Sequence, residues 1–142
     1  MLSIKELSSK KELTEFVKFP LSLYPNHPYW VPPLINDEVA SFDKTKNPVF
    51  ENAEAFFYGA YNEKGKMVGR VAAIVNQHDL KQGAKKVRFG WLDMIDDIEV
   101  TKALLNKVTE KAREYQLEYI EGPMGFSSMD KVGLLTEGYD HI

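Results

Sequence analysis

The 142-residue chain contains no cysteine and carries no excess of positive charge. Without cysteine, the chain cannot form disulfides, thiol nucleophiles or thiolate metal sites. Its 18 Lys and Arg residues against 21 Asp and Glu residues give a net charge of −3. A surface that neutralises nucleic-acid phosphates normally shows a basic excess, so we expect no nucleic-acid partner.

Long apolar runs are also missing. The first residues, MLSIKELSSKKEL, are too polar for a signal peptide, and no run approaches the length that spans a membrane. We therefore expect a cytoplasmic protein without a membrane partner. The three histidines are far apart and share no metal-ligand spacing, so we expect no metal site. The length and the 44% hydrophobic content favour one globular domain over residues 1–142.

The first third of the chain has clear boundary signals. Residues 2–7 alternate in polarity and are predicted to form a short strand. Ser9 and Glu12 form a capping-box pattern, which predicts a helix that begins near Lys10. Pro20 lacks a backbone N–H and restricts the residue before it, so we expect the helix to end or kink there.

Residues 25–33, PNHPYWVPP, contain four of the seven prolines and form a stiff, extended arm. The arm could be a polyproline-type ligand, or Tyr29 and Trp30 could form an aromatic wall over a binding cleft. The interpretation that we favour is a rigid connector that Trp30 fixes to the core. Residues 34–43 are predicted to form a short helix, and residues 43–54 a loop.

A β-hairpin is predicted next. Residues 55–61 and 67–75 are apolar and β-prone, and Gly65 supplies the turn between them. Their nearly continuous hydrophobicity is typical of central strands that are covered on both faces. Arg70 is the one charge in the second strand, and we interpret it as a snorkelling or paired structural residue. Residues 76–86 are predicted to form a loop.

Residues 87–124 are predicted to form a βαβ crossover with two parallel strands. Phe89 and Trp91 are expected on one face of the first strand. The helix should begin after Asp96 or Asp97, where a carboxylate can cap it. Ligands of open sheets tend to bind where strands end and helices begin, so we expect any small-molecule site at this turn. The helix has one apolar stripe, which comprises Val100, Leu104, Val108, Ala112 and Tyr115.

The order of these elements resembles the GNAT acyltransferase fold. Four strings make the likeness more specific: FVKFPLSLYPNHPYWVPPL, KNPVFE, VGRVAAIVNQHD and EGPMGFSSMDKVGLL. They resemble a family of bacterial GNAT-like proteins of largely unassigned function, whose members are much longer. The resemblance implies an α+β fold with a mixed, mostly antiparallel sheet flanked by helices, lacking the last helix and strands. The chain would then be an N-terminal portion or a shortened relative, and its open strand edge favours a homo-oligomer or pairing with the missing C-terminal half.

The resemblance also implies an activity, which is N-acyl transfer from acetyl-CoA or another acyl-CoA to an amine. In GNAT enzymes the strand before the long helix splays from its neighbour and binds the pantetheine arm, and the next turn binds the pyrophosphate. Asp93 is the candidate catalytic carboxylate, because it lies on the strand, where a base could deprotonate an incoming amine. By the resemblance Tyr139 is the candidate general acid, and Tyr29 and Trp30 would line the amine cleft. The cofactor-binding residues that it implies are Trp91, Leu92, Asp93, Met94, Asp97 and Ile98.

The turn at residues 94–99, MIDDIE, departs from the GNAT pattern, because it has three acidic residues and no glycine or arginine. A helix N-terminus attracts anions through its unpaired amides and its dipole. The carboxylates already supply that negative charge and would repel a pyrophosphate, although salt screens the effect. The acidic cluster of Asp93, Asp96, Asp97 and Glu99 could be a divalent-metal site or an acid/base pair. The interpretation that we favour is helix capping and compensation of the helix dipole. The turn favours an alternative function, a degenerate or non-catalytic GNAT-like domain for assembly or ligand binding.

Overall fold

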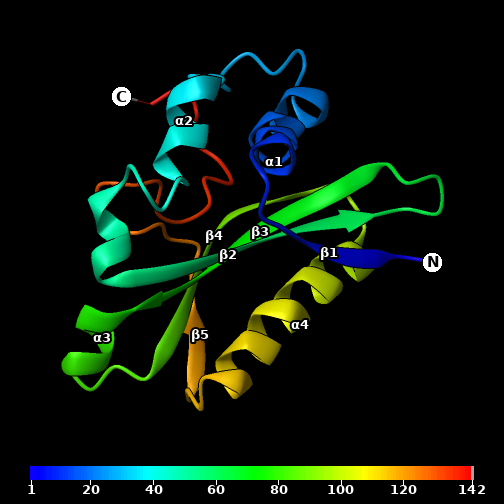
Figure 1. Cartoon of the computed structure of the whole chain (residues 1–142). Helices are drawn as coiled ribbons and strands as arrows, with labels where there is room; N and C mark the ends of the chain where they lie inside the picture. Colours follow the sequence, from blue (N-terminus) through cyan, green and yellow to red (C-terminus); the bar gives the residue numbers. More distant parts are fainter. Residues whose placement is uncertain (142) are drawn as a thin grey trace.

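The computed structural model describes residues 1–141 (Figure 1). Five strands form one sheet in the order β1-β2-β3-β4-β5, and only β4 and β5 run parallel. The strands are β1 (Ser3–Leu7), β2 (Ala53–Tyr61), β3 (Met67–Asn76), β4 (Lys86–Met94) and β5 (Tyr119–Glu121). The helices are α1 (Lys10–Leu23), α2 (Ile35–Ser41), α3 (Gln77–Lys81) and α4 (Ile98–Glu114), with a 3-10 turn η1 at Pro48–Glu51. The predicted α+β fold with a mixed, mostly antiparallel sheet is confirmed.

The sheet separates two hydrophobic layers. Helices α1 and α2 cover one face and α4 covers the other (Figure 1). Nearly every residue of the central strand β3 is buried, which confirms a strand covered on both sides. The layer under α1 and α2 contains Leu13, Phe16, Val17, Phe42 and Phe57. The layer under α4 contains Val71, Val87, Val100, Leu104 and Val108.

The predicted helix starts are confirmed. The Ser9 side chain accepts a hydrogen bond from the backbone N–H of Glu12, and the Glu12 carboxylate accepts from the backbone N–H groups of Ser8 and Ser9. These two backbone donors hold the pKa of Glu12 at about 2. At α4 the cap is Asp97, and the predicted apolar stripe faces the sheet. No helix in residues 1–141 is both long and apolar enough to cross a membrane.

Two predictions of local structure are wrong. Residues 76–86, expected as a loop, contain the short helix α3, because the Asn76 side chain caps the backbone N–H of His78 at 2.8 Å. Residues 43–54 contain η1, which the Asn47 side chain caps in the same way. A single asparagine side chain can start one helical turn without any apolar periodicity. A prediction of helices from apolar periodicity therefore does not detect such turns.

The helix α1 also does not end at Pro20, which was one of the two predicted outcomes, but continues to Leu23. A proline inside a helix leaves the carbonyl four residues earlier without its usual donor. Here that carbonyl belongs to Phe16, and it accepts a hydrogen bond of 2.8 Å from Nη1 of Arg70 on β3. A side chain from another element therefore replaces the missing backbone bond, which the local sequence does not reveal.

Strand β4 contains a bulge, which changes the side of the sheet on which one of its aromatic side chains lies. Asp93 pairs with Arg70 and Gly90 pairs with Ala72, so two residues of β4 lie opposite one residue of β3. Within the bulge, Trp91 has a positive φ of 48°. The extra residue places Phe89 on the α4 side of the sheet and Trp91 on the α1 and α2 side. The expectation that these two aromatic rings share a face is therefore wrong.

The fit of α4 against β3 depends on Gly69. A Cβ atom at this position would lie 2.8 Å from Cγ1 of Val100 and 2.9 Å from Cδ1 of Leu104.

We expect Gly69→Ala to lower the free energy of unfolding by about 1–3 kcal/mol, measured by urea denaturation, because α4 must move outward. The control is Gly65→Asn in the hairpin turn, where φ is +74° and the space is open. Asparagine tolerates that conformation, so a change within about 0.5 kcal/mol is expected there. Equal losses at both positions would contradict the close approach.

Candidate functional site

Strands β4 and β5 diverge towards the end of β4. They pair only over Lys86–Arg88 and Tyr119–Glu121, and one further bond joins the N–H of Met124 to the carbonyl of Phe89 at 2.8 Å. Strand β4 continues to Met94, so its last residues have no partner on β5. The segment after β5 still lies against Gly90, but Leu92 and Asp93 line the cavity beyond it. We call this last part of β4, which has no strand partner on the β5 side, its open edge.

A cavity of about 580 Å³ lies at this end of the sheet. Pockets for small ligands are commonly about 300–1,000 Å³, so the volume suits a small molecule. Three regions far apart in the sequence meet here: the end of α1 with the arm and α2, the strands β3 and β4, and the segment after β5. Among the residues that line it are Tyr24, His27, Tyr29, Trp30, Glu38, Arg70, Trp91, Leu92, Asp93, Asp130, Leu135 and Tyr139.

An ion pair between the buried Arg70 and the half-buried Asp93 lies in the cavity lining. Arg70 is 5% exposed, and its Nε and Nη2 atoms both donate to Oδ2 of Asp93, at 3.0 and 2.8 Å. Its third nitrogen donates to the Phe16 carbonyl described above. Burial lowers the pKa of the Arg70 guanidinium, and the Asp93 carboxylate opposes that shift. The interpretation of Arg70 as a paired structural residue is confirmed.

The second oxygen of the same carboxylate is also engaged. The Tyr24 hydroxyl donates to Oδ1 of Asp93 at 2.9 Å. Burial, followed by the negative charge of Asp93, raises the pKa of Tyr24 to about 12. Tyr24 therefore stays protonated at neutral pH and remains a hydrogen-bond donor. The Asp93 side chain is held by three protein donors on its two oxygens.

Glu38 of α2 is far from Arg70 and Asp93 in the sequence, but it lines the same cavity. The indole Nε1 of Trp91 donates to Oε1 of Glu38 at 2.8 Å. The other oxygen, Oε2, is buried and has no hydrogen-bond partner among the described residues. In the sequence Glu38 lies in an ordinary short-helix pattern, which carries no signal of function. Its contact with Trp91 appears only when β4 and α2 come together in the fold.

Aromatic rings form one wall of the cavity. The ring centroids of Tyr24 and Trp30 are 5.6 Å apart, and Tyr29 stacks on Tyr139 at 5.9 Å. The Tyr139 hydroxyl donates to the Leu135 carbonyl at 2.6 Å. The arm packs on the end of α1 through the contact of Trp30 with Tyr24, and Tyr29 and Trp30 line the cavity. Trp30 is not among the residues of the two hydrophobic layers, so the expected anchoring of the arm in the core is not seen. A binding role for the aromatic wall stays a prediction.

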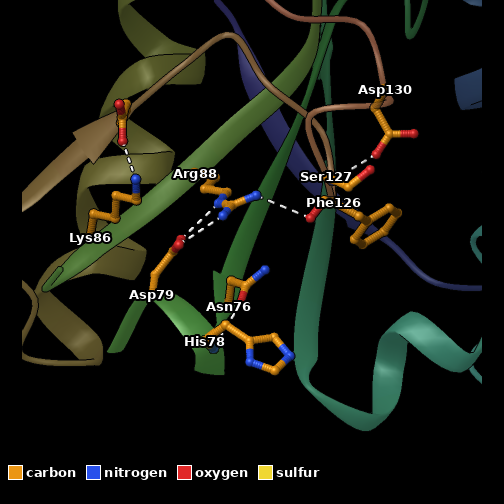
Figure 2. Close-up of polar contacts among 9 residues, drawn as sticks. Asn76, His78, Asp79, Lys86, Arg88, Phe126, Ser127 and Asp130 are labelled. Carbon is orange, nitrogen blue, oxygen red and sulfur yellow. Dashed lines mark hydrogen bonds and ion pairs between the residues drawn. The ribbon is translucent and has the colours of Figure 1, made fainter. Parts of the chain in front are cut away.

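The segment after β5 is fixed beside the cavity by Arg88 of β4. Figure 2 shows its guanidinium between the Asp79 carboxylate, with both bonds at 2.7 Å, and the Phe126 carbonyl at 3.0 Å. The backbone N–H of Ser127 donates to Asp130 at 2.9 Å, which closes the next turn. The Phe126 ring is buried against Trp91, with centroids 5.5 Å apart. The β4 bulge and this segment therefore form one wall of the cavity.

Comparisons with known proteins identify the fold. No family model matches the chain. Protein YghO of Escherichia coli K12 is 32% identical over 143 residues, which cover 96% of this chain, and the chain spans 35% of the length of that curated relative. An acetyltransferase of the GNAT family from Staphylococcus aureus Mu50 is 18% identical with a TM-score of 0.57, over 87% of this chain and 74% of that one. A predicted acetyltransferase of Clostridium acetobutylicum, solved with acetyl-CoA, is 12% identical with a TM-score of 0.56, over 85% and 79% of the two chains.

The chain has the GNAT fold. This confirms the resemblance drawn from the element order and the four sequence strings. At these identities the solved structures establish the fold alone, so the chemistry has to be argued from the residues of this chain.

Only some of the residues that the GNAT resemblance implied for the cofactor lie at the cavity. Trp91, Leu92 and Asp93 line it. Met94 packs in the layer under α4. Asp97 and Ile98 lie at the start of α4 and are not part of the cavity lining.

The N-terminus of α4 does not fit a pyrophosphate. The Asp97 side chain accepts from the backbone N–H of Glu99 at 2.9 Å, and the Asp97 carbonyl accepts from Val100 and Thr101. These amides are therefore bonded within the chain, and the exposed carboxylates of the turn add negative charge. The interpretation of Asp97 as a helix cap is confirmed. Within residues 1–141, no three His, Asp or Glu side chains are grouped to hold a metal ion.

The buried pair predicts a strong energetic coupling. We expect Arg70→Met and Asp93→Leu each to lower the free energy of unfolding by about 3 kcal/mol, because each leaves one charge without its partner. The double variant should lose at least about 2 kcal/mol less than the sum of the two single variants. Urea denaturation of all four proteins gives this coupling energy.

The control is the exposed pair Lys102 and Glu99, for which a coupling below about 0.5 kcal/mol is expected. Additive losses at Arg70 and Asp93 would contradict the pairing.

Proposed function

We propose that this chain supplies the acyl-transfer site of an N-acyltransferase, which moves an acyl group from an acyl-CoA thioester to an amine. The observation that carries the proposal is the open edge of β4 beside the cavity, in a chain with the GNAT fold. An extended pantetheine arm carries amide groups that can bond an unpaired strand edge as another strand would. The cavity is needed for this proposal, because the acceptor amine must lie beside the strand edge that binds the donor.

In the proposed reaction the amine nitrogen attacks the thioester carbonyl carbon, a C–N bond forms and the C–S bond breaks. Negative charge develops on the carbonyl oxygen, and backbone N–H groups of a rigid site stabilise such charge. The β4 bulge is suited to this role, because Trp91 and Leu92 have no residue-by-residue partners on β3. Strained backbone of this kind, with a positive φ at Trp91, is often found at functional sites.

The two residues predicted to be catalytic, Asp93 and Tyr139, both line the cavity. Since three protein donors already hold the Asp93 carboxylate, we assign it the positioning of Tyr24 and not the removal of a proton from the amine. Three tyrosines line the cavity, Tyr24, Tyr29 and Tyr139. We assign protonation of the departing sulfur to Tyr24 or Tyr139, each of which must first release its present hydrogen bond, to Asp93 or to the Leu135 carbonyl. Tyr29 and Trp30 form the side of the cavity where the amine would enter.

The activity can be measured as thiol release from acetyl-CoA with a panel of primary amines and the whole chain. We expect release that depends on the amine, and at least tenfold slower release by Tyr24→Phe, since general acid catalysis contributes roughly a hundredfold or more. The control is Tyr119→Phe, because that ring is 46% exposed on β5 and distant from the cavity lining. Release that ignores the amine, or equal rates for both variants, would contradict the proposal.

A second prediction concerns the acidic turn. We expect Asp97→Gly to strengthen coenzyme A binding about two- to fivefold in calorimetry at low salt, because it removes a like charge and leaves the Glu99 amide unbonded. Asp97→Asn is the matched variant, since asparagine keeps the cap and removes only the charge. It should give a smaller gain. If neither variant binds coenzyme A more tightly than the parent chain, the charge argument is wrong.

A further inference from the structure

The carboxylates around the cavity differ in how they are neutralised. Asp93 forms an ion pair with Arg70, and Asp130 closes a turn by accepting from the backbone N–H of Ser127. Glu38 has neither kind of partner: in the described chain no Lys, Arg or His nitrogen lies within 4.0 Å of it. It accepts one hydrogen bond, from the uncharged indole of Trp91.

The geometry of Glu38 points to a donor from outside the chain. Its Oε1 is bonded to Trp91 while its Oε2 is buried without a partner among residues 1–141. Nearly all buried polar groups in native proteins are hydrogen-bonded, so an unbonded carboxylate oxygen beside a cavity is a site for a ligand N–H. Glu38 lines the cavity, and the last torsion of a glutamate is soft, so its carboxylate can rotate towards a ligand while the Trp91 hydrogen bond readjusts.

The aromatic wall of the same cavity favours a cation as that ligand. Tyr24, Trp30 and the stacked pair of Tyr29 and Tyr139 present aromatic rings to the same cavity. Aromatic faces attract cations through their quadrupole, and they also pack against apolar groups. Among the described residues Glu38 makes no ion pair of its own, although its charge acts on the Arg70 guanidinium beyond contact distance. A carboxylate of this kind, combined with such a wall, suits a primary ammonium attached to an aromatic or apolar body.

We propose that Glu38 binds the ammonium group of the acceptor, a primary amine with an aromatic or apolar body, and accepts the proton that this group must lose before it can attack. This inference rests on the proposed function. One proton passes from the ammonium to the Glu38 carboxylate and then to solvent. The second proton leaves the nitrogen when the C–N bond forms, and it ends on the departing thiol. Glu38 is therefore the specificity-determining carboxylate of the cavity.

Binding can be tested without any acyl donor. The chain has two tryptophans, so its ¹⁵N–¹H spectrum has two indole signals, and Trp30→Phe assigns them. The probes are 2-phenylethylammonium and the neutral 2-phenylethanol, titrated separately. We expect the cation to shift the Trp91 indole signal and to bind about tenfold more tightly than the alcohol, because a charge-assisted hydrogen bond is stronger than a neutral one.

The matched variants are Glu38→Gln and Asp37→Asn. Glutamine still accepts from the Trp91 indole but has no charge, so cation binding should weaken about tenfold while alcohol binding stays unchanged. Asp37 is exposed and outside the cavity lining, so Asp37→Asn should leave both affinities unchanged. Equal binding of the two probes to the parent chain would overturn the inference, as would equal losses in both variants. Cation binding that depends on Glu38 but comes without any thiol release would support Glu38 as the ammonium site and would contradict both the acyl-transfer proposal and the proton transfer assigned to Glu38.

Discussion

The buried guanidinium of Arg70 is the interaction on which the rest of the site depends. It lies on the central strand, and its three nitrogens bond to the Phe16 carbonyl of α1 and the Asp93 carboxylate of β4. The first contact allows α1 to continue past Pro20, which carries Tyr24 to the cavity. The second fixes the strand just after the bulge. Because buried polar groups are costly when unpaired, these contacts permit only one arrangement of helix and strands.

The cavity follows from that arrangement. The bulge turns Trp91 to the face of α1 and α2, where its indole reaches Glu38, while the divergence of β4 from β5 leaves a strand edge open. An acyl thioester along that edge and an amine between Glu38 and the aromatic wall would meet at the bulge. The turn at residues 94–99 works against the phosphates of coenzyme A, so the donor would be held mainly through its pantetheine arm.

The sequence predicted the elements that local signals determine. The Ser9 and Glu12 cap, the hairpin around Gly65 and the stripe of α4 each depend on neighbours a few residues away, and the structure confirms them. The continuation of α1 through Pro20, the bulge at Trp91 and the contact of Trp91 with Glu38 depend on residues more than fifty positions apart or on strand register. No local pattern encodes such contacts. The GNAT resemblance supplied the fold, but it could not assign the partners of Asp93, which limit what that carboxylate can do.

Hydrogen exchange with and without acetyl-CoA tests most directly where the donor binds. The account predicts slower exchange at the amides of residues 91–94, which the pantetheine arm would cover, and unchanged exchange at residues 96–99. Protection centred on residues 96–99 would contradict it, because the phosphates would then occupy the acidic turn. If millimolar acetyl-CoA slowed exchange at none of the amides, the proposal that this chain binds an acyl-CoA donor would be contradicted.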